Sequence, residues 1–520
     1  MYTIPASGEA GPLILRAMIE LTGGDLTLER FAAIVQGRDS CALAASARPR
    51  IEAARRFVEK VVAADRPVYG VNTGFGDLAQ VKIAAKDVRV LQERLLVSHA
   101  AGVGDPLPAG VVRGMLLLRA NTLARGHSGV RPIVIERLLE LLDRDLLPRV
   151  PSRGSVGASG DLAPLAHLAL PLVGRGFLVS DGEGRPALEV LSAHGLEPLA
   201  LEAKEGLALI NGTQAMTSLL AIAVLEARGL IKLADLAGAL STDALRGTDT
   251  AFDSRLHALR PHPGQLASAE NLRRLLAGSA IRESHRDGDL RVQDPYSIRC
   301  MPQVHGAVRD VLSSVEDRVE IEMNAVTDNP LLFPADGVVL AGGNFHGEPM
   351  ALAADELTIA VAELAAISER RIEKLTNHSF SGLPAFLVAE PGLDSGFMIA
   401  QVTAAALVSE NKVLAHPASV DSIPTSADKE DHVSMGMGAA LKLQQVVKNV
   451  KHVLAIELLT AAQGIDLLRP LRSSQTLEEV HAEIRREIPV WEHDREMAPA
   501  IESCVRLVES KLASHLEALR

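Results

Sequence analysis

The sequence predicts a mainly α-helical protein that contains a bundle of unusually long helices. Three stretches, 211–240, 349–375 and 434–468, repeat apolar residues at positions i, i+3, i+4 and i+7. Each stretch is longer than an ordinary globular helix and apolar around much of its circumference, which is typical of helices buried in a bundle. Strand signals are few, since the chain has no long alternating run and no strand–helix–strand rhythm.

The chain before the long helices predicts shorter helices separated by loops that contain Gly and Pro. A helix is predicted within 26–37, where Thr27 can cap the N-terminus and a glycine follows the apolar stripe. A second helix is predicted within 91–104 and is expected to end at Gly102 and Gly104.

We expect three regions along the chain. Residues 1–205 are expected to form a head that carries two Gly-rich loops, 69–76 and 154–160. Residues 206–475 are expected to form the bundle of long helices. Residues 476–520, rich in Glu, Arg and Lys, are expected to form surface helices.

Composition and charge narrow the class of protein. With 520 residues, 47% of them apolar, the chain is long enough for a large core. A net charge of −12 without a basic run argues against nucleic acid or an anionic membrane as partner. The N-terminus lacks the pattern of a signal peptide, and the most apolar segment, 210–229, meets Glu226 and Arg228 too early to span a bilayer. Three widely separated cysteines fit a reducing compartment, so we expect a cytoplasmic protein.

Several standard active-site motifs are absent from the sequence. The Gly-rich stretch 69–76 has neither the phosphate-loop pattern nor the dinucleotide spacing. No H-E-x-x-H or C-x-x-C occurs, so no dedicated metal site is expected, and no G-x-S-x-G elbow occurs. An active site in this chain must therefore supply its own electrophile.

The loop "GSVGASG", residues 154–160, can supply that electrophile. It runs directly into a predicted helix, which Asp161 can cap and in whose first turn Pro164 is tolerated. The positive end of that helix, beginning at Leu162, would stabilise negative charge beside the loop. If the loop is compressed, the nitrogen of the glycine in Ala-Ser-Gly (158–160) can attack the alanine carbonyl, because glycine has no Cβ to obstruct it. Loss of two waters then leaves the electrophile 4-methylidene-imidazol-5-one.

With "GSVGASGDLAPLAHLAL" around the tripeptide, the sequence resembles the histidine/phenylalanine/tyrosine ammonia-lyase family. Seven further blocks occur in the family's order between about residues 69 and 440: "YGVNTGFGDLA", "LVSHAAGVG", "LALINGTQAM", "VQDPYSIRCMPQVHGA", "NAVTDNPL", "GGNFHGEPMA" and "EDHVSMG". The resemblance implies the long-helix fold of the fumarase/aspartase-like superfamily and a homotetramer whose active sites are shared between subunits. It also implies that the electrophilic ring forms autocatalytically from Ala158, Ser159 and Gly160, without an exogenous cofactor.

The resemblance also assigns catalytic and binding roles. Tyr69 would be the base that removes a β-proton from the substrate, which requires a site that favours its phenolate, since an ordinary tyrosine pKa lies near 10. Tyr296 and Arg299 lie one helical turn apart and can share a face, with Arg299 holding the substrate carboxylate bidentately. The remaining residues would bind the ring and the amino group or pack behind the ring: Asn211, Gln293, Tyr296 and Phe345.

Two positions indicate the substrate. Histidine-specific members carry Ser-His where this chain has Ser98 and His99, and they carry Glu where it has Glu430. A histidine and a carboxylate are sensible partners for an imidazole, and a pocket of polar groups would reject a phenyl ring. The implied reaction converts L-histidine to trans-urocanate and ammonia. The chain departs from the histidine pattern at Pro295, Asp428 and Lys429, and Lys429 is placed to pair with the adjacent carboxylate and redirect it.

Two alternatives stay open from the sequence. The first is a sister enzyme on the same scaffold, either a tyrosine or phenylalanine ammonia-lyase or a 2,3-aminomutase that returns the amine to the β-carbon. The second is a helical scaffold protein without catalysis. An aminomutase retains the intermediate product and a lyase releases it, and no feature of the sequence distinguishes these two outcomes.

Overall fold

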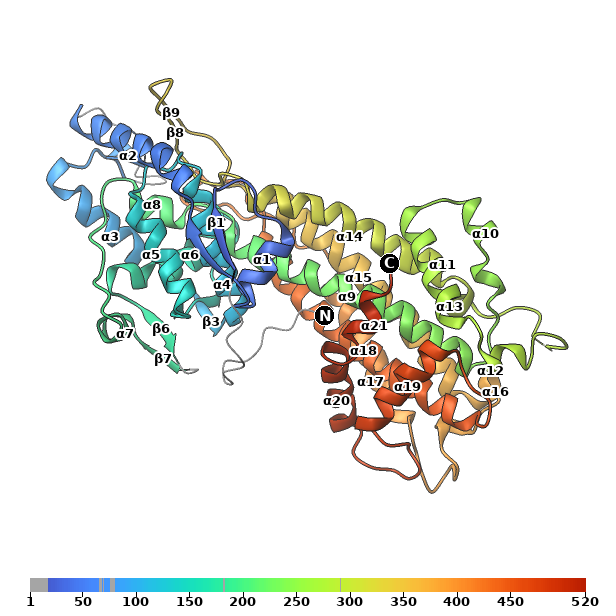
Figure 1. The fold of residues 1–520 in the computed structure, drawn as a ribbon. Coiled ribbons are helices and arrows are strands. Elements are labelled where there is room, and N and C mark those ends of the chain that lie inside the picture. The colour runs from blue at the N-terminus through green and yellow to red at the C-terminus, as the bar shows by residue number, and fades with distance from the viewer. Residues whose placement is uncertain (1–16, 65–67, 69, 75–79, 181–182, 290) are drawn as a thin grey trace.

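The computed structural model describes residues 17–520 except 65–67, 69, 75–79, 181–182 and 290. Figure 1 shows a head of shorter helices and small sheets at one end of a set of long helices. A second group of short helices lies at the other end, and the C-terminus lies near the middle. The mainly α-helical fold that the sequence predicts is confirmed.

Four long helices run side by side through the middle of the molecule: α9 (Gln214–Ala244), α14 (Met301–Met323), α15 (Glu348–Thr376) and α18 (Gly436–Leu467). Helix α15 packs along α18 and α14, and α9 packs along α18 and α14. Three of these helices lie in the stretches whose periodicity predicts long helices. The fourth long helix, α14, was not predicted, because its charged residues leave a narrower apolar face.

The head contains the shorter helices. Thr27 caps the first of them, since its side chain accepts the N–H of Arg30, as the sequence predicts. The second predicted helix ends at His99, before the expected Gly102 and Gly104, because the following residues enter a strand instead. The helices of the head are α1 (Leu28–Val35), α2 (Arg48–Ala63), α3 (Val88–His99), α4 (Ala109–Ala124), α5 (Pro132–Asp143), α6 (Leu162–Ala169), α7 (Ala187–Ala193) and α8 (Glu205–Ile210).

Strands are short and form four small sheets in the described part of the chain. β1 (Met18–Leu21) pairs in parallel with β2 (Ser40–Leu43), with Ile19 opposite Cys41. The other pairs are antiparallel: β3 (Val103–Pro106) with β5 (Pro151–Arg153), β6 (Phe177–Ser180) with both β4 (Leu147–Pro148) and β7 (Glu183–Pro186), and β8 (Leu331–Phe333) with β9 (Val338–Leu340).

The far end of the bundle carries most of the remaining helices. Helix α17 (Met398–Leu414) lies along α18 and α15, and buries only Ala400, Ala404 and Asn411. No helix among the described residues is long and apolar enough to cross a membrane. The others at this end are α10 (Ser254–Ala258), α11 (Pro263–Leu276), α12 (Ala280–Glu283), α13 (Tyr296–Arg299), α16 (His378–Ser381) and α19 (Gln475–Glu487), whereas α20 (Ala498–Glu509) and α21 (Ala513–Glu517) lie nearer the middle of the long helices.

A buried ion pair joins three of the long helices. Arg371 of α15 and Glu457 of α18 are fully buried, and the guanidinium donates from Nε and Nη2 to the two carboxylate oxygens at 2.5 and 2.8 Å. The hydroxyls of Ser241 on α9 and Ser368 on α15 donate to the same carboxylate at 2.7 and 2.6 Å. Because every carboxylate oxygen is paired, the charge is compensated inside the apolar bundle.

Replacing Arg371 with methionine would leave Glu457 buried without its cation. We expect Arg371→Met to lower the free energy of unfolding by about 3–5 kcal/mol, because an uncompensated buried charge is costly. Urea unfolding followed by circular dichroism, at one fixed protein concentration, measures the change. The double variant Arg371→Met/Glu457→Leu should recover most of the loss, and equal losses in the single and double variants would contradict this account.

Candidate active site

The loop of residues 154–160 lies in the head between β5 and α6 and forms a tight turn. Ser159 adopts a left-handed conformation with φ of 52°, and its flanking glycines, Gly157 and Gly160, have φ of 89° and 80°. The N–H of Gly160 donates to the carbonyl of Gly157 at 3.1 Å. A left-handed serine costs on the order of 1–2 kcal/mol, so the surrounding structure must hold the loop in this shape.

The segment that precedes α9 presses directly on this loop. A Cβ at Gly160 would lie 2.2 Å from the carbonyl oxygen of Gly212, so only glycine fits there. The N–H of Asp161 donates to the same oxygen at 2.7 Å. Position 160 therefore requires glycine because the backbone of Gly212 approaches it closely. The sequence alone does not reveal this contact.

Asp161 caps a different helix from the one that its sequence position suggests. It is the N-cap residue of α6, but its side chain makes no capping hydrogen bond to that helix. Instead Oδ2 accepts the N–H groups of Ala215 and Met216, in the first turn of α9, at 3.0 and 2.9 Å. The prediction that Asp161 caps α6 is therefore wrong. The side chain caps α9 instead, because the approach of residues 211–213 brings the N-terminus of α9 to the carboxylate. Pro164 lies in the first turn of α6, as predicted.

The environment of Asp161 alters its acidity. The carboxyl is fully buried, and this desolvation raises its pKa to about 7. Hydrogen bonds from the N–H of Met216, the hydroxyl of Ser155 and the N–H of Ala215 act in the opposite direction and favour the carboxylate. Ser155 donates to Oδ1 at 3.2 Å, so the side chain also holds the start of the loop.

Two predicted site residues contact Ser159 directly. The Ser159 hydroxyl donates to Oε1 of Glu430 at 2.8 Å, and the Ser159 carbonyl accepts from Nδ2 of Asn211 at 3.3 Å. The other carboxylate oxygen of Glu430 accepts from the hydroxyl of Thr425 at 2.8 Å. Oδ1 of Asn211 is buried and has no hydrogen-bond partner in the described part of the protein. It is therefore ready to accept a hydrogen bond from a bound molecule.

His99 and Ser98 end helix α3 near this cluster. Nδ1 of His99 lies 2.9 Å from the carbonyl of Leu95 and 3.0 Å from the Ser98 hydroxyl, which itself donates to that carbonyl at 3.1 Å. Desolvation lowers the pKa of His99, and the nearby charge of Glu430 acts to raise it. His99 is thus favoured as a neutral imidazole whose Nδ1–H donates to the backbone, which leaves Nε2 as an acceptor.

Three predicted residues lie at the opposite end of the bundle. Gln293 precedes α13, which carries Tyr296 and Arg299, and Figure 1 places α13 far from α6. The Arg299 guanidinium lies 4.4 Å from the centroid of the Tyr296 ring, so the two residues share a face as their spacing predicts. Tyr296 is 70% exposed, and Nε of Arg299 is buried without a partner among the described residues. A single chain therefore does not bring these side chains to Ser159.

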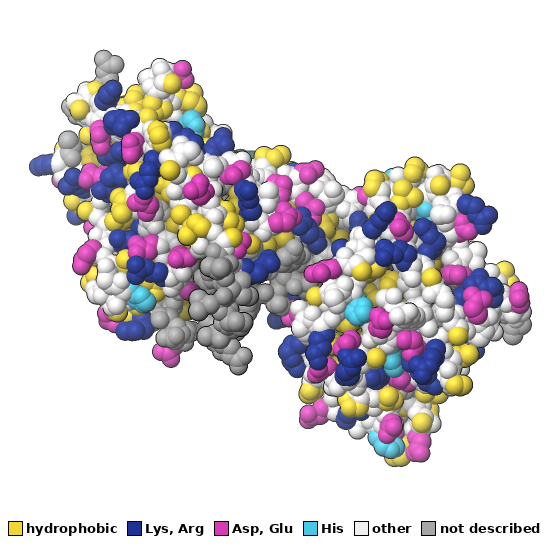
Figure 2. All heavy atoms as spheres, viewed as in Figure 1, with side chains coloured by type: hydrophobic (Ala, Val, Ile, Leu, Met, Phe, Trp, Pro, Cys, Tyr) yellow, Lys and Arg dark blue, Asp and Glu magenta, His cyan; other side chains and the backbone are white. Residues whose placement is uncertain are grey.

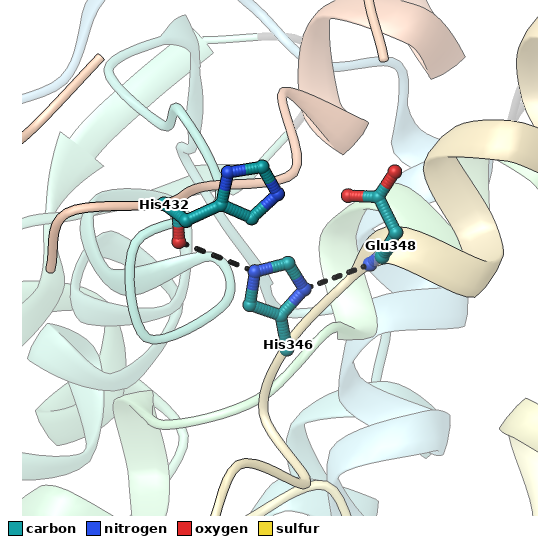
Figure 3. Close-up of side chains that lie close together, drawn as sticks. All are labelled: His346, Glu348 and His432. Carbon is teal, nitrogen blue, oxygen red and sulfur yellow. Dashed lines mark hydrogen bonds between the residues drawn. The ribbon is translucent and has the colours of Figure 1, made fainter. Parts of the chain in front are cut away.

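Phe345 lies on a loop that contacts the loop of Glu430. Phe345 is half-buried, and the next residue, His346, bonds through Nε2 to the carbonyl of His432 at 3.3 Å. The rings of His346 and His432 stack with centroids 5.9 Å apart, as Figure 3 shows. This contact joins the Phe345 loop to the Glu430 loop at their bases.

His346, Glu348 and His432 also resemble a metal site, since a ligand atom of each lies within 4.8 Å of the others. Figure 3 shows why these three residues are poorly suited to bind a metal ion. Nδ1 of His346 accepts the N–H of Glu348 at 3.3 Å, and Nε2 donates to the carbonyl of His432. Both ring nitrogens are engaged with the backbone, so His346 has no free lone pair for a cation. The arrangement acts as a clamp between loops.

Two expectations from the sequence concern neighbours of these residues. Tyr69, the expected base, lies outside the described residues, so its role stays a prediction. Lys429 does not redirect Glu430 in the described part of the chain, where both carboxylate oxygens accept from hydroxyls instead. Asp428 has φ of 63°, a conformation that Asp and Asn both tolerate.

The order of these loops and helices along the chain matches a known family. The model of the aromatic amino acid lyases matches residues 26–486, which include every predicted site residue. The chain belongs to the aromatic amino acid lyase family.

Individual relatives cover nearly the whole chain. Histidine ammonia-lyase of Deinococcus radiodurans is 56% identical over 475 residues, 91% of this chain and 90% of that protein. The crystal structure of histidine ammonia-lyase from Trypanosoma cruzi has a TM-score of 0.88 and 46% identity, covering 96% of this chain and 94% of its own. Tyrosine aminomutase from Streptomyces globisporus has a TM-score of 0.92 and 37% identity, covering 96% and 98%.

Sequence reasoning on this aromatic amino acid lyase missed one residue at the centre of the site. Thr425 contacts Glu430 from five positions earlier in the chain, through a turn that no sequence pattern announces. The only signal is a short run of small and polar residues, "PTSAD", before Glu430. The run predicts a loop but not which hydroxyl faces the carboxylate.

The raised pKa of Asp161 predicts how stability depends on pH. Because its folded pKa of about 7 lies above the ordinary value of 3.8, the folded protein binds this proton more tightly than the unfolded chain. The contribution to stability is therefore complete below about pH 4 and is lost as the pH rises to about 7. Over that range the wild type should lose stability relative to Asp161→Asn, by at most about 1.4 kcal/mol per pH unit.

Urea unfolding of both proteins at several pH values between 4 and 8 measures this difference. The comparison cancels the other titrating groups, which the two proteins share. A difference in the free energy of unfolding that stays constant over the whole range would show that Asp161 titrates normally.

Proposed function

We propose that this chain is a carbon–nitrogen lyase that converts L-histidine to trans-urocanate and ammonia. The observation that carries the proposal is the contact of Glu430 with Ser159, in a chain whose relatives include a histidine ammonia-lyase that is 56% identical over most of its length. The contact puts an acceptor for an imidazole N–H beside the residue that is expected to become the electrophile.

The residues around Ser159 fit the expected 4-methylidene-imidazol-5-one. Ser159 is held in a left-handed conformation, Gly160 has no room for a side chain, and Asn211 donates to the carbonyl that the ring would retain. This ring would supply an electrophilic carbon that makes the amino nitrogen of the substrate a good leaving group. Asn211 would stabilise negative charge on the retained oxygen, as a fixed donor aimed at developing charge does.

Loss of the Ser159 hydroxyl would free one oxygen of Glu430. Oε1 now accepts from that hydroxyl, whereas Oε2 stays bonded to Thr425. Oε1 can then accept an N–H of the substrate imidazole, and the free nitrogen of His99 offers a second acceptor. A phenyl ring would leave these acceptors unpaired, which supports histidine over phenylalanine as the substrate.

The remaining roles would be taken by the other residues that the sequence predicts for the site. Arg299 would hold the substrate carboxylate, with Tyr296 and Gln293 beside it, and Tyr69 would take the β-proton. The free oxygen of Asn211 would accept from the substrate amino group. Phe345, on the loop clamped to that of Glu430, would pack behind the ring.

We infer a homotetramer in which the two half-sites come from different subunits. Long helices hold α13 and the Ser159 loop at opposite ends of one chain, so another copy must complete the site. Helix α17 exposes apolar side chains along much of its length, with Ile399 63%, Val402 51% and Val413 73% exposed. Apolar surface of this kind marks an interface between subunits.

On the face drawn in Figure 2, acidic and basic side chains are intermingled, and no uniform basic patch appears there among the described residues.

We also infer a cytoplasmic location, which the cysteines support. Cys41, Cys300 and Cys504 are free thiols, as in a reducing compartment.

The proposed reaction can be tested by near-ultraviolet absorbance of the purified protein mixed with L-histidine. We expect a urocanate band, and we expect Ser159→Ala to abolish it because the electrophile cannot form. Mass spectrometry should show the wild-type peptide that carries Ser159 to be two waters lighter than its sequence. A dehydrated peptide without the band would overturn histidine as the substrate, and tyrosine, phenylalanine and β-amino acid products would then separate the lyase and aminomutase alternatives.

The shared site can be tested by mixing two inactive chains. We expect Ser159→Ala and Arg299→Met each to be inactive alone, and their co-expression to restore activity at up to roughly a quarter of the sites, if the chains associate at random. Some sites then combine an intact Ser159 loop with an intact α13 from another chain. Purified heterotetramers that carry both variants and stay inactive would show that each site is built within one chain.

A further inference from the structure

Thr425 holds the carboxylate that faces Ser159. Its hydroxyl donates to Oε2 of Glu430 at 2.8 Å, while Oε1 accepts from the Ser159 hydroxyl at the same distance. The two residues also pair through the backbone, since the N–H of Thr425 donates to the carbonyl of Glu430 at 2.9 Å and the reverse bond is 3.3 Å. One residue thus fixes both the backbone and the side chain of Glu430.

The turn between these two residues is strained. Ser426, Ala427 and Asp428 have φ of 52°, 52° and 63°, so three consecutive residues other than glycine are left-handed. Each costs on the order of 1–2 kcal/mol, and such a turn persists only where its ends are held together. The pairing of Thr425 with Glu430 closes the turn and supplies that restraint.

A competitor for the carboxylate lies next to it. Lys429 is an exposed cation adjacent to Glu430, and it forms no ion pair with that carboxylate among the described residues. A carboxylate with one oxygen free would be attracted to this ammonium and would turn away from the substrate position. The hydroxyl of Thr425 occupies Oε2 and opposes that rotation, because a hydrogen bond to a charged group is stronger than one between neutral groups.

We propose that Thr425 is a positioning residue that keeps Glu430 aimed at the substrate ring against the pull of Lys429. The proposal rests on the proposed function, because Glu430 binds the imidazole there. Thr425 itself does not touch the substrate. It fixes the side-chain conformation in which Oε1 faces the position of Ser159, and so it contributes to the preference for a ring with N–H groups.

Four variants test this role with L-histidine as the substrate. Thr425→Val has the shape of threonine without the hydroxyl, and it should lower kcat/KM roughly 10- to 100-fold, mainly through a higher KM, because a bond to a charged group is lost. Thr425→Ser keeps the hydroxyl and should retain most of the activity. Adding Lys429→Gln to Thr425→Val removes the competing cation and should recover a large part of the lost kcat/KM, whereas Lys429→Gln alone should change little.

The outcomes separate this inference from the proposed function. A wild type without urocanate formation overturns the proposed function and this inference with it. If the wild type is active, equal kcat/KM in Thr425→Val and Thr425→Ser overturns the role of the hydroxyl. No recovery in Thr425→Val/Lys429→Gln overturns the competition, since a merely structural defect would not respond to the neutralisation of an exposed lysine. Dehydration of the Ser159 peptide in each variant, measured by mass, confirms that the loop has folded. If it has not folded in Thr425→Val, Thr425→Ala takes the place of that variant.

Discussion

The contact between Asp161 and the first turn of α9 is the interaction on which the rest of the site depends. It attaches the Ser159 loop of the head to the N-terminus of a helix 31 residues long that runs through the bundle. The same approach puts Gly212 against Gly160 and Asn211 within hydrogen-bond distance of the Ser159 carbonyl. The strained conformation of Ser159 is thereby supported by a long and largely buried helix, which suits the proposed role of the loop.

The length of the helices explains why the predicted site residues form two separate groups in one chain. At about 1.5 Å per residue, a helix of 31 residues spans roughly 45 Å. One end carries Ser159, Asn211 and Glu430, and the other carries α13, which is anchored where Nη1 of Arg371 donates to the carbonyl of Ser297 at 3.3 Å. The ion pair of Arg371 with Glu457 therefore stabilises both the bundle and the segment that presents Arg299. Under the proposed function this geometry couples assembly to activity, because no bend in a packed bundle could close such a gap.

The carboxylates of the site are distinguished by their surroundings. Asp161 is fully buried, and desolvation raises its pKa to about 7 although three donors face it. Glu430 is half-buried, with a hydroxyl on each oxygen and a cation next to it in the chain. The carboxyl of Asp161 accepts backbone N–H groups and is buried away from solvent. The carboxylate of Glu430 faces Ser159, where we propose that the substrate ring binds. Their different tasks follow from burial and partners rather than from residue type.

The sequence by itself determined the helical class, the positions of three long helices, the cap at Thr27 and the identity of the residues in the loop, because these follow from local periodicity and local hydrogen bonding. Motif order also determined the family. Only the tertiary structure decided that Asp161 caps α9, that Gly160 is required by the carbonyl of Gly212, and that Thr425 rather than Lys429 holds Glu430. It also decided that Arg299 and Ser159 lie apart in one chain. These facts depend on contacts between segments distant in sequence or on side-chain orientation within a strained turn, and neither leaves a periodic pattern in the chain.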